Sequence, residues 1–180
     1  MKKKFIIIAL VCLATAYVQA QQTRTAKKQP DAAMVQQNDH DFVMKALEGG
    51  NAEIMKGALA KTNSTSPQIM EYGKMMEQDH HSVNEKLRET ARQKGYDVND
   101  KLSPEAQQQF DKLKNLRGAD FDREFAMQMI SDHQKAIELF TKQSENGQDA
   151  ELKKLASEAL PKLRHHLTRI EQLQGTSDKR

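Results

Sequence analysis

The stretch Met75-Met76-Glu77-Gln78-Asp79-His80-His81 returns in altered form as Met127-Gln128-Met129-Ile130-Ser131-Asp132-His133. In both copies a methionine lies four residues before a histidine, and an aspartate directly precedes that histidine. Each copy sits in the middle of a long segment whose apolar residues recur at spacings of three and four, the period of an α-helix. The pattern therefore predicts two long helices with a histidine at the centre of each apolar face.

The same periodicity, together with capping residues, divides the rest of the chain into helices. Ser66-Pro67 and Ser103-Pro104 each combine a helix-capping serine with a proline at the first helical position. We predict an all-α fold: an up-down four-helix bundle with a short extra helix in the connection between helices two and three. The expected helices cover residues 39–62, 67–94, 104–116, 120–146 and 149–175, and residues 176–180 form a tail.

Glycine and proline leave alternatives inside two of these helices. Gly49-Gly50 and Gly57 cost about 1 kcal/mol each in a helix interior relative to alanine. They indicate either a break in the first helix or close approach of a neighbouring helix, and we expect an unbroken helix. Pro161 removes a backbone hydrogen bond in the fourth helix, so we expect one continuous but kinked helix there.

The N-terminal residues have the pattern of a targeting segment. Lys2 to Lys4 precede an apolar run that ends with small residues in Val18-Gln19-Ala20. This order predicts a signal peptide over residues 1–20, and the run is too short for a comfortable membrane span of about 20 residues. Residues 21–38 are rich in Gln, Lys and Thr and predict a disordered spacer. The bundle domain is then residues 39–175, and we expect a periplasmic or otherwise exported protein of a bacterial envelope.

Removal of residues 1–20 would change the charge and the redox chemistry of the chain. The segment carries three lysines and no acid, so the net charge of +3 becomes zero. A neutral chain offers no electrostatic footprint for nucleic acid. Cys12, the one cysteine, leaves with the segment, so disulfide and thiolate chemistry are excluded from the mature chain. We expect no nucleic-acid partner and no transmembrane span after cleavage. An envelope protein or a second copy of the chain remains open as a partner.

One ionisable residue lies near the middle of the apolar face of each long helix: Glu53, His80, His133 and His166. A single histidine on such a face is more often a hydrogen-bonded core residue than a metal ligand. Four such groups in one core must satisfy one another, water or a metal ion, because an unpartnered buried polar group costs several kcal/mol. Imidazole and carboxylate suit Zn, Fe, Cu or Mn, so these residues are our candidate metal ligands.

Residues beside these four are weaker candidates. Glu77 lies three residues before His80, which is the Glu-x-x-His spacing of di-iron bundles. Ile130 and Leu163 occupy the corresponding positions before the other two histidines, so a symmetric di-iron centre is incomplete. Asp79 and Asp132 are either hydrogen-bond partners of the ligands or surface acids. Met76 and Met129 are core residues or soft copper ligands, and the remaining neighbours, His81 and His165, are expected to face solvent.

Several spaced motifs together resemble the bacterial family known as domain of unknown function 4142. They are Phe42-Val43, Gly49 to Glu53, Met76 to His80, Phe121-Asp122, Met129 to His133 and Leu160 to Leu167. The resemblance covers residues 39–173 and implies a ferritin-like four-helix bundle in the bacterial envelope, with no established activity. It carries recurring polar positions onto Glu53, Asp79, His80, Asp132, His133 and His166. Asn51, His81 and His165 depart from the family pattern, and the two extra histidines leave a second, surface metal contact open.

Two functional hypotheses of different classes follow. The first is metal binding in the bundle core, used in metal handling or a stress response. The alternative is a structural or interaction module of the cell envelope without a metal, whose histidines are hydrogen-bonded core residues. A redox enzyme is less supported, because the carboxylates of a di-iron oxidase are incomplete. No nucleophile–base–acid set or phosphate-binding loop is found in the sequence, so we assign no catalytic residues.

Overall fold

The computed structural model describes the backbone of residues 32–177 and the side chains of residues 38–175. The predicted signal peptide and most of the predicted spacer lie outside this range. Within it every regular element is a helix, and no strand occurs between residues 32 and 177. The helices are α1 (Ala32–Asn63), α2 (Pro67–Lys94), α3 (Pro104–Lys114), α4 (Gly118–Asn146) and α5 (Ala150–Ser177). The predicted all-α class is therefore confirmed.

The two Ser-Pro signals begin helices as expected. The hydroxyl of Ser66 accepts a hydrogen bond from the Ile69 amide, and that of Ser103 accepts one from the Ala106 amide. Gly95 ends α2 in the left-handed conformation with φ 69°, which glycine adopts without a steric penalty. Each cap satisfies backbone groups that a helix terminus otherwise leaves unpaired.

Helices α1 and α5 extend beyond their predicted ends, and α4 starts at Gly118 instead of Asp120. Helix α1 starts at Ala32 instead of Asp39, so it takes in the end of the predicted spacer. Polar composition suggested a spacer there, but Ala32-Ala33-Met34 consists of strong helix formers that extend an existing helix at little cost. Helix α5 continues through Gly175 to Ser177, so Gly175 is not its terminus.

The glycines of α1 were expected to mark either a break in the helix or the close approach of a neighbouring helix. Helix α1 is unbroken, and Gly50 and Gly57 face close neighbours on α2, whereas a Cβ atom at Gly49 would meet nothing within 4 Å. A Cβ atom at Gly57 would come within 2.6 Å of the Gly73 carbonyl oxygen of α2. A Cβ atom at Gly73 would come within 2.6 Å of the Ala60 side chain. The Gly57–Gly73 crossing therefore lets the backbones of α1 and α2 approach more closely than any side chain permits.

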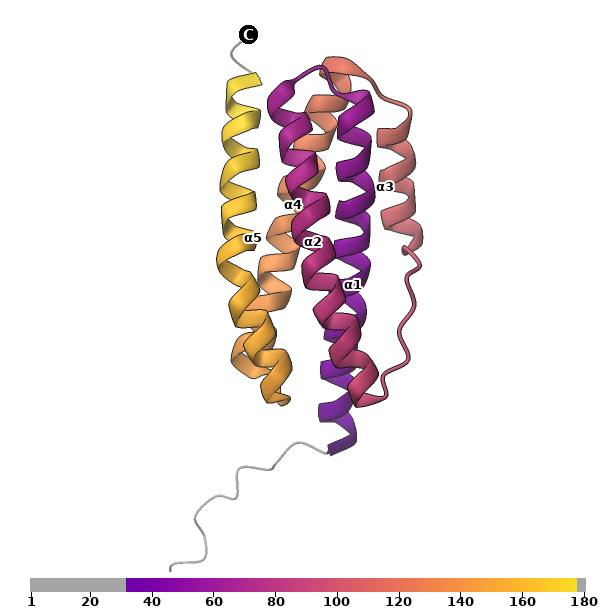
Figure 1. The fold of residues 1–180 in the computed structure, drawn as a ribbon, viewed down its shortest axis with the longest axis vertical. Coiled ribbons are helices and arrows are strands. Elements are labelled where there is room, and N and C mark those ends of the chain that lie inside the picture. The colour runs from indigo at the N-terminus through magenta and orange to yellow at the C-terminus, as the bar shows by residue number, and fades with distance from the viewer. Residues whose placement is uncertain (1–31, 178–180) are drawn as a thin grey trace, which may run out of the picture. The chain divides into compact units, whose positions relative to one another are not determined.

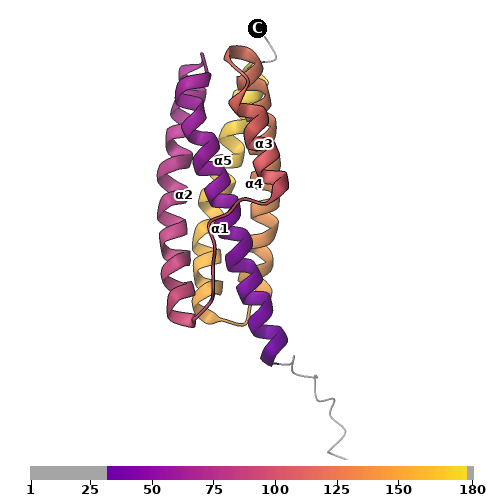
Figure 2. The ribbon, with the colours of Figure 1, turned by 90° about the vertical axis from the view of Figure 1, so that its right-hand side faces the viewer.

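The four long helices lie side by side, and α3 packs outside α1 and α4 (Figures 1 and 2). Their directions do not alternate as the predicted up-down bundle requires, because the long connector returns the chain before α4 begins (Figure 2). The first part of α1 contacts the end of α4, where Asp39 accepts a hydrogen bond from Gln143 at 2.8 Å. The short turn at residues 64–66 makes α1 and α2 antiparallel, so α2 and α4 run in the same direction. The connector and α3 carry the chain back along the molecule between them (Figure 2).

The core consists of two apolar clusters separated by polar side chains. One cluster includes Phe42, Leu47, Leu87, Phe140 and Leu152, and the other includes Tyr72, Met76, Phe121, Phe125 and Met129. Each long helix contributes to both clusters and carries Glu53, His80, His133 or His166 between its two contributions. The polar groups predicted from the apolar stripes therefore form a layer across the middle of the core. No helix in the described part of the chain is long and apolar enough to cross a membrane.

Candidate metal centre

The structure brings together the four groups predicted on the apolar stripes. Glu53 is 3 % exposed, His80 5 %, His133 0 % and His166 1 %. The three histidines each present one ring nitrogen, and these nitrogens lie within 4.8 Å of one another. Each side chain comes from a different long helix, so the site forms only when all four helices pack.

Glu53 faces the outer nitrogens of two of the imidazoles. Its Oε2 lies 3.1 Å from Nδ1 of His80, and its Oε1 lies 3.2 Å from Nδ1 of His133. The Nδ1–H of His133 donates to the Met129 carbonyl oxygen at 2.9 Å, so Oε1 of Glu53 has no hydrogen-bond partner of its own. Acceptors at both Nδ1 atoms favour the tautomers that carry the proton on Nδ1 and a lone pair on Nε2. The Nε2 atom of His80 has no hydrogen-bond partner.

Asp79 orients the imidazole of His166 through its Nε2 atom, whereas His80 and His133 are held at Nδ1. The Nε2–H of His166 donates to Oδ2 of Asp79 at 2.8 Å, and Lys162 donates to Oδ1 at 2.8 Å. Partial burial raises the pKa of Asp79, but the hydrogen bonds from Lys162 and His166 outweigh it and hold the pKa below its usual value. With its proton on Nε2, His166 turns a lone pair on Nδ1 toward the centre.

One ring nitrogen of each histidine lies in a common cluster. Nε2 of His133 lies 3.3 Å from Nδ1 of His166, and neither atom carries a proton in these tautomers. Two ligand nitrogens on a tetrahedral metal with bonds of 2.0–2.1 Å are separated by roughly the same distance, about 3.3 Å. Carboxylate–imidazole–metal chains use this arrangement, in which the outer N–H is held and the inner nitrogen is left free.

Burial keeps His80 and His166 neutral. Desolvation, with a smaller contribution from His133, lowers the pKa of His80 to about 3. Desolvation also lowers the pKa of His166 to about 4, although its hydrogen bond to Asp79 opposes the shift. A proton is thus disfavoured between the rings at neutral pH, and the neutral imidazole that metal ions require is already present.

These depressed pKa values predict acid sensitivity of the metal-free protein. An unfolded histidine binds a proton below about pH 6.5, whereas folded His80 and His166 stay neutral down to about pH 3 and 4. The unfolded state then holds more protons, so stability present above pH 6.5 is lost as the pH falls toward 4. Urea unfolding with chelator should show a slope of about 1.4 kcal/mol per pH unit for each such imidazole.

Two adjacent residues provide the control for this pH dependence. His80→Gln should reduce the slope by about 1.4 kcal/mol per pH unit, the contribution of one imidazole. His81→Gln should leave the slope unchanged, because His81 is exposed. A slope that His80→Gln leaves intact would mean that His80 titrates normally in the folded protein.

Other predicted candidates lie outside the centre. Glu77 pairs with Lys61 at 2.9 Å instead of joining the three histidines. Met76 and Met129 are fully buried in the second apolar cluster, as the core alternative expected. His81 and His165 are exposed.

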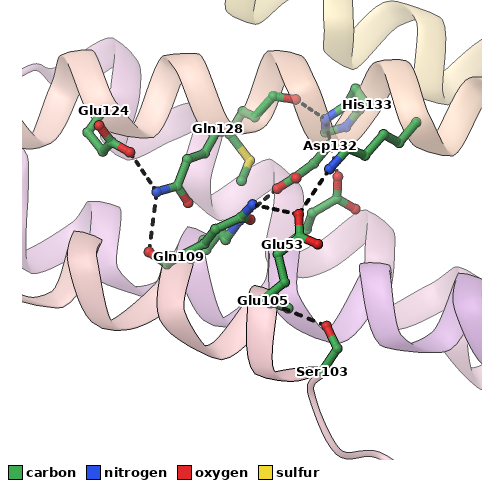
Figure 3. Close-up of polar contacts among 12 residues, drawn as sticks. Glu53, Ser103, Glu105, Gln109, Glu124, Gln128, Asp132 and His133 are labelled. Carbon is green, nitrogen blue, oxygen red and sulfur yellow. Dashed lines mark hydrogen bonds and ion pairs between the residues drawn. The ribbon is translucent and has the colours of Figure 1, made fainter.

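A buried lysine that the sequence did not predict lies next to the centre. Lys56 is 0 % exposed, and its Nζ donates to Asp132 Oδ2 at 2.7 Å and to Gln109 Oε1 of α3 at 3.0 Å. Burial raises the pKa of Asp132, and the attraction of Lys56 opposes that shift. Figure 3 shows Asp132 beside His133 on α4 and Gln128 between Glu124 and Gln109. Asp132, predicted as a partner of a ligand, thus pairs with Lys56.

A cavity of about 310 Å³ adjoins the histidines. His80, His166 and Glu53 form part of its wall, and Lys56 and Asp132 lie along it. Exposed residues of α1, α3 and α4, among them Lys45, Glu105 and Lys135, also line it. The candidate centre is therefore buried but borders a space that extends toward the surface.

Comparison with known proteins agrees with this fold. The family described as "Domain of unknown function (DUF4142)" matches residues 24–173. No curated protein matches the chain. Among solved structures, a fragment of DUF305 from Deinococcus radiodurans is similar with a TM-score of 0.69 at 16 % identity, covering 77 % of this chain and 96 % of that one. CopM in Cu(I)-bound and Cu(II)-bound forms gives TM-scores of 0.66 and 0.67 at 18 % identity, with the same coverage.

Proposed function

Because the chain belongs to the DUF4142 family, for which no function is described, we propose its function from the buried centre: it binds a transition-metal ion through His80, His133 and His166. The observation that carries the proposal is the set of three inward lone pairs whose outer N–H groups all have acceptors. The three lone pairs repel one another in the metal-free protein, and one bound cation would remove this repulsion. Hydrogen bonding within the core leaves the buried Nε2 of His80 without a partner.

Glu53 takes a different role in this proposal from the one that its position in the sequence suggested. We predicted it as a ligand, but both of its oxygens face the outer Nδ1 atoms. It therefore positions His80 and His133 and supplies a compensating negative charge, and Asp79 does the same for His166. A bound metal ion would then have three imidazole ligands and one open coordination position.

Copper is the first candidate among Zn, Fe, Cu and Mn. Neutral imidazole suits copper, and the similar structures of CopM are described as Cu(I)-bound and Cu(II)-bound. We further propose that the four long helices form a ferritin-like bundle, exported through the segment at residues 1–20, and that it serves metal handling in a bacterial envelope.

Thermal melting with and without metal tests the site. Wild type with excess copper should gain stability by mass action, about 4 kcal/mol at a thousandfold excess over the dissociation constant. His133→Ala should lose most of this gain. In chelator the same variant should change little, because it also removes one of the opposed lone pairs. Zinc, iron and manganese, each added alone, rank the metals.

Surface histidines provide the control, since they bind metals weakly without a built site. His81→Ala and His165→Ala should keep the full copper response because both residues are exposed. If wild type and His133→Ala respond alike to every metal, the core site is wrong and the envelope-module alternative gains support. The protein must be purified without a polyhistidine tag.

A further inference from the structure

The cavity beside the centre has an apolar body. Its wall includes Val83, Ala136, Leu139, Phe140, Ala159 and Leu163, in addition to the polar groups already described. His80 and His166 border the cavity, whereas His133 does not. At about 310 Å³ it falls in the range of small-molecule sites, which are mostly apolar with a few convergent polar groups. Its size and lining suit a small organic molecule.

The cavity lies where a fourth metal ligand would enter. His80 lines the cavity wall, and its buried Nε2 has no hydrogen-bond partner. On the other side of the histidines, Met76 and Met129 close the core as fully buried members of the second apolar cluster. A metal held by three imidazoles keeps one position open, and the cavity is the space from which that position is reached.

Six of the charged side chains along the cavity are paired with one another, while Lys45, Glu48 and Glu53 are outside these pairs. Lys56 pairs with Asp132 at 2.7 Å, Lys162 with Asp79 at 2.8 Å, and Lys135 with Glu105 at 3.4 Å. A ligand with an ionised group away from its donor atom would bury that charge without a partner, which costs several kcal/mol. A neutral ligand avoids this cost and gains from the apolar wall.

We propose that the cavity is a ligand site, in which a small neutral molecule with an apolar body donates a lone pair to the open position of the metal. The inference rests on the proposed metal centre and adds the class of its ligand. It makes the centre an open one, which exchanges a ligand, rather than a closed site that only holds an ion.

Pyridine and pyridine-3-carboxylate are matched probes for this site. They share a ring and a donor nitrogen, but only the second carries a negative charge at pH 7.5. With full-length protein loaded with one equivalent of Cu(II), pyridine should change the electron paramagnetic resonance spectrum saturably without releasing copper. Pyridine-3-carboxylate should bind about tenfold more weakly or worse, a difference of about 1.4 kcal/mol. Equal binding of the two probes would overturn the neutral class of ligand.

Variants that fill the cavity test whether pyridine reaches the metal through it. Ala136→Leu on α4 and Ala159→Leu on α5 add bulk to the wall, and the second serves if the first does not fold. Both should retain one equivalent of Cu(II) and weaken pyridine about tenfold or more. Ala58→Leu is the matched control, because Ala58 is exposed on α1 and outside the cavity.

The outcomes separate the two proposals. If Cu(II) does not bind with nitrogen ligands, the metal centre itself fails. If Cu(II) binds but pyridine leaves its spectrum unchanged, the ligand site fails and the metal centre stands. Pyridine binding that is equal in wild type and in both filled variants would also overturn the ligand site, since the probe would then reach copper by another path.

Discussion

Replacing Asp132 with alanine should lower the free energy of unfolding by about 3–5 kcal/mol, the cost of breaking a buried ion pair by removing one partner. Lys56 is fully buried, so without Asp132 its ammonium group keeps only the Gln109 oxygen at 3.0 Å. The neutral amide cannot compensate a buried positive charge. Urea unfolding of the metal-free protein at pH 7.5 measures the change.

Removing both charges distinguishes an ion pair from simple loss of packing. Lys56→Met keeps the length of the side chain, and in the Lys56→Met, Asp132→Ala double variant most of the stability should return. Glu105→Ala is the surface control, because its pair with Lys135 is exposed on both sides and should contribute about 1 kcal/mol or less. A loss below about 1 kcal/mol for Asp132→Ala would mean that Lys56 reaches water in solution.

Replacing Phe125 with alanine should cost about 3–5 kcal/mol, the usual range for a large aromatic residue in a core. Phe125 is fully buried, stacks on Phe121 with ring centroids 5.5 Å apart, and meets Tyr72 edge-on at 6.0 Å. Tyr72 in turn donates to the His166 carbonyl oxygen at 3.3 Å. The alanine variant should therefore weaken the core and also loosen the helix that carries one of the imidazoles.

Copper affinity measured beside the stability shows whether this second effect is real. Phe125→Leu keeps most of the apolar volume and should cost less than about 1.5 kcal/mol, with copper affinity close to wild type. Phe125→Ala should bind copper more weakly even at temperatures where it is fully folded. Equal affinity in wild type and Phe125→Ala would show that the aromatic cluster supports the fold but does not position His166.

The residues of the centre were predictable because each interrupts an apolar stripe. His80, His133 and His166 stand where a helix of period 3.6 points inward, and local spacing is sufficient to find such positions. The direction of each ring was not predictable, because it depends on neighbours from other helices. For Glu53, the sequence predicts its place beside the histidines, but only the packed structure shows that its oxygens face Nδ1 atoms.

Lys56 was missed for a related reason. A lysine three residues after Glu53 is ordinarily solvated, and its burial depends on α3, which the sequence assigned only as a short helix in a connection. The sequence does place Lys56 one turn from Glu53, which is the one signal that could have drawn attention to it. The shared direction of α2 and α4 was likewise hidden, because periodicity reports which face of a helix is buried but not how a connector runs.

The arrangement of the long helices has a consequence for how the molecule opens. Helices α1 and α2 form one hairpin and α4 and α5 another, each joined by a short turn, so each hairpin can assemble from contacts that are local in sequence. The imidazoles are divided between them: His80 belongs to the first hairpin, and His133 and His166 belong to the second. An ion bound to all three is a cross-link over the seam where the hairpins dock. A bound ion would therefore oppose separation of the hairpins, a sub-global unfolding event, and would link the opening rate of the molecule to the occupancy of the site.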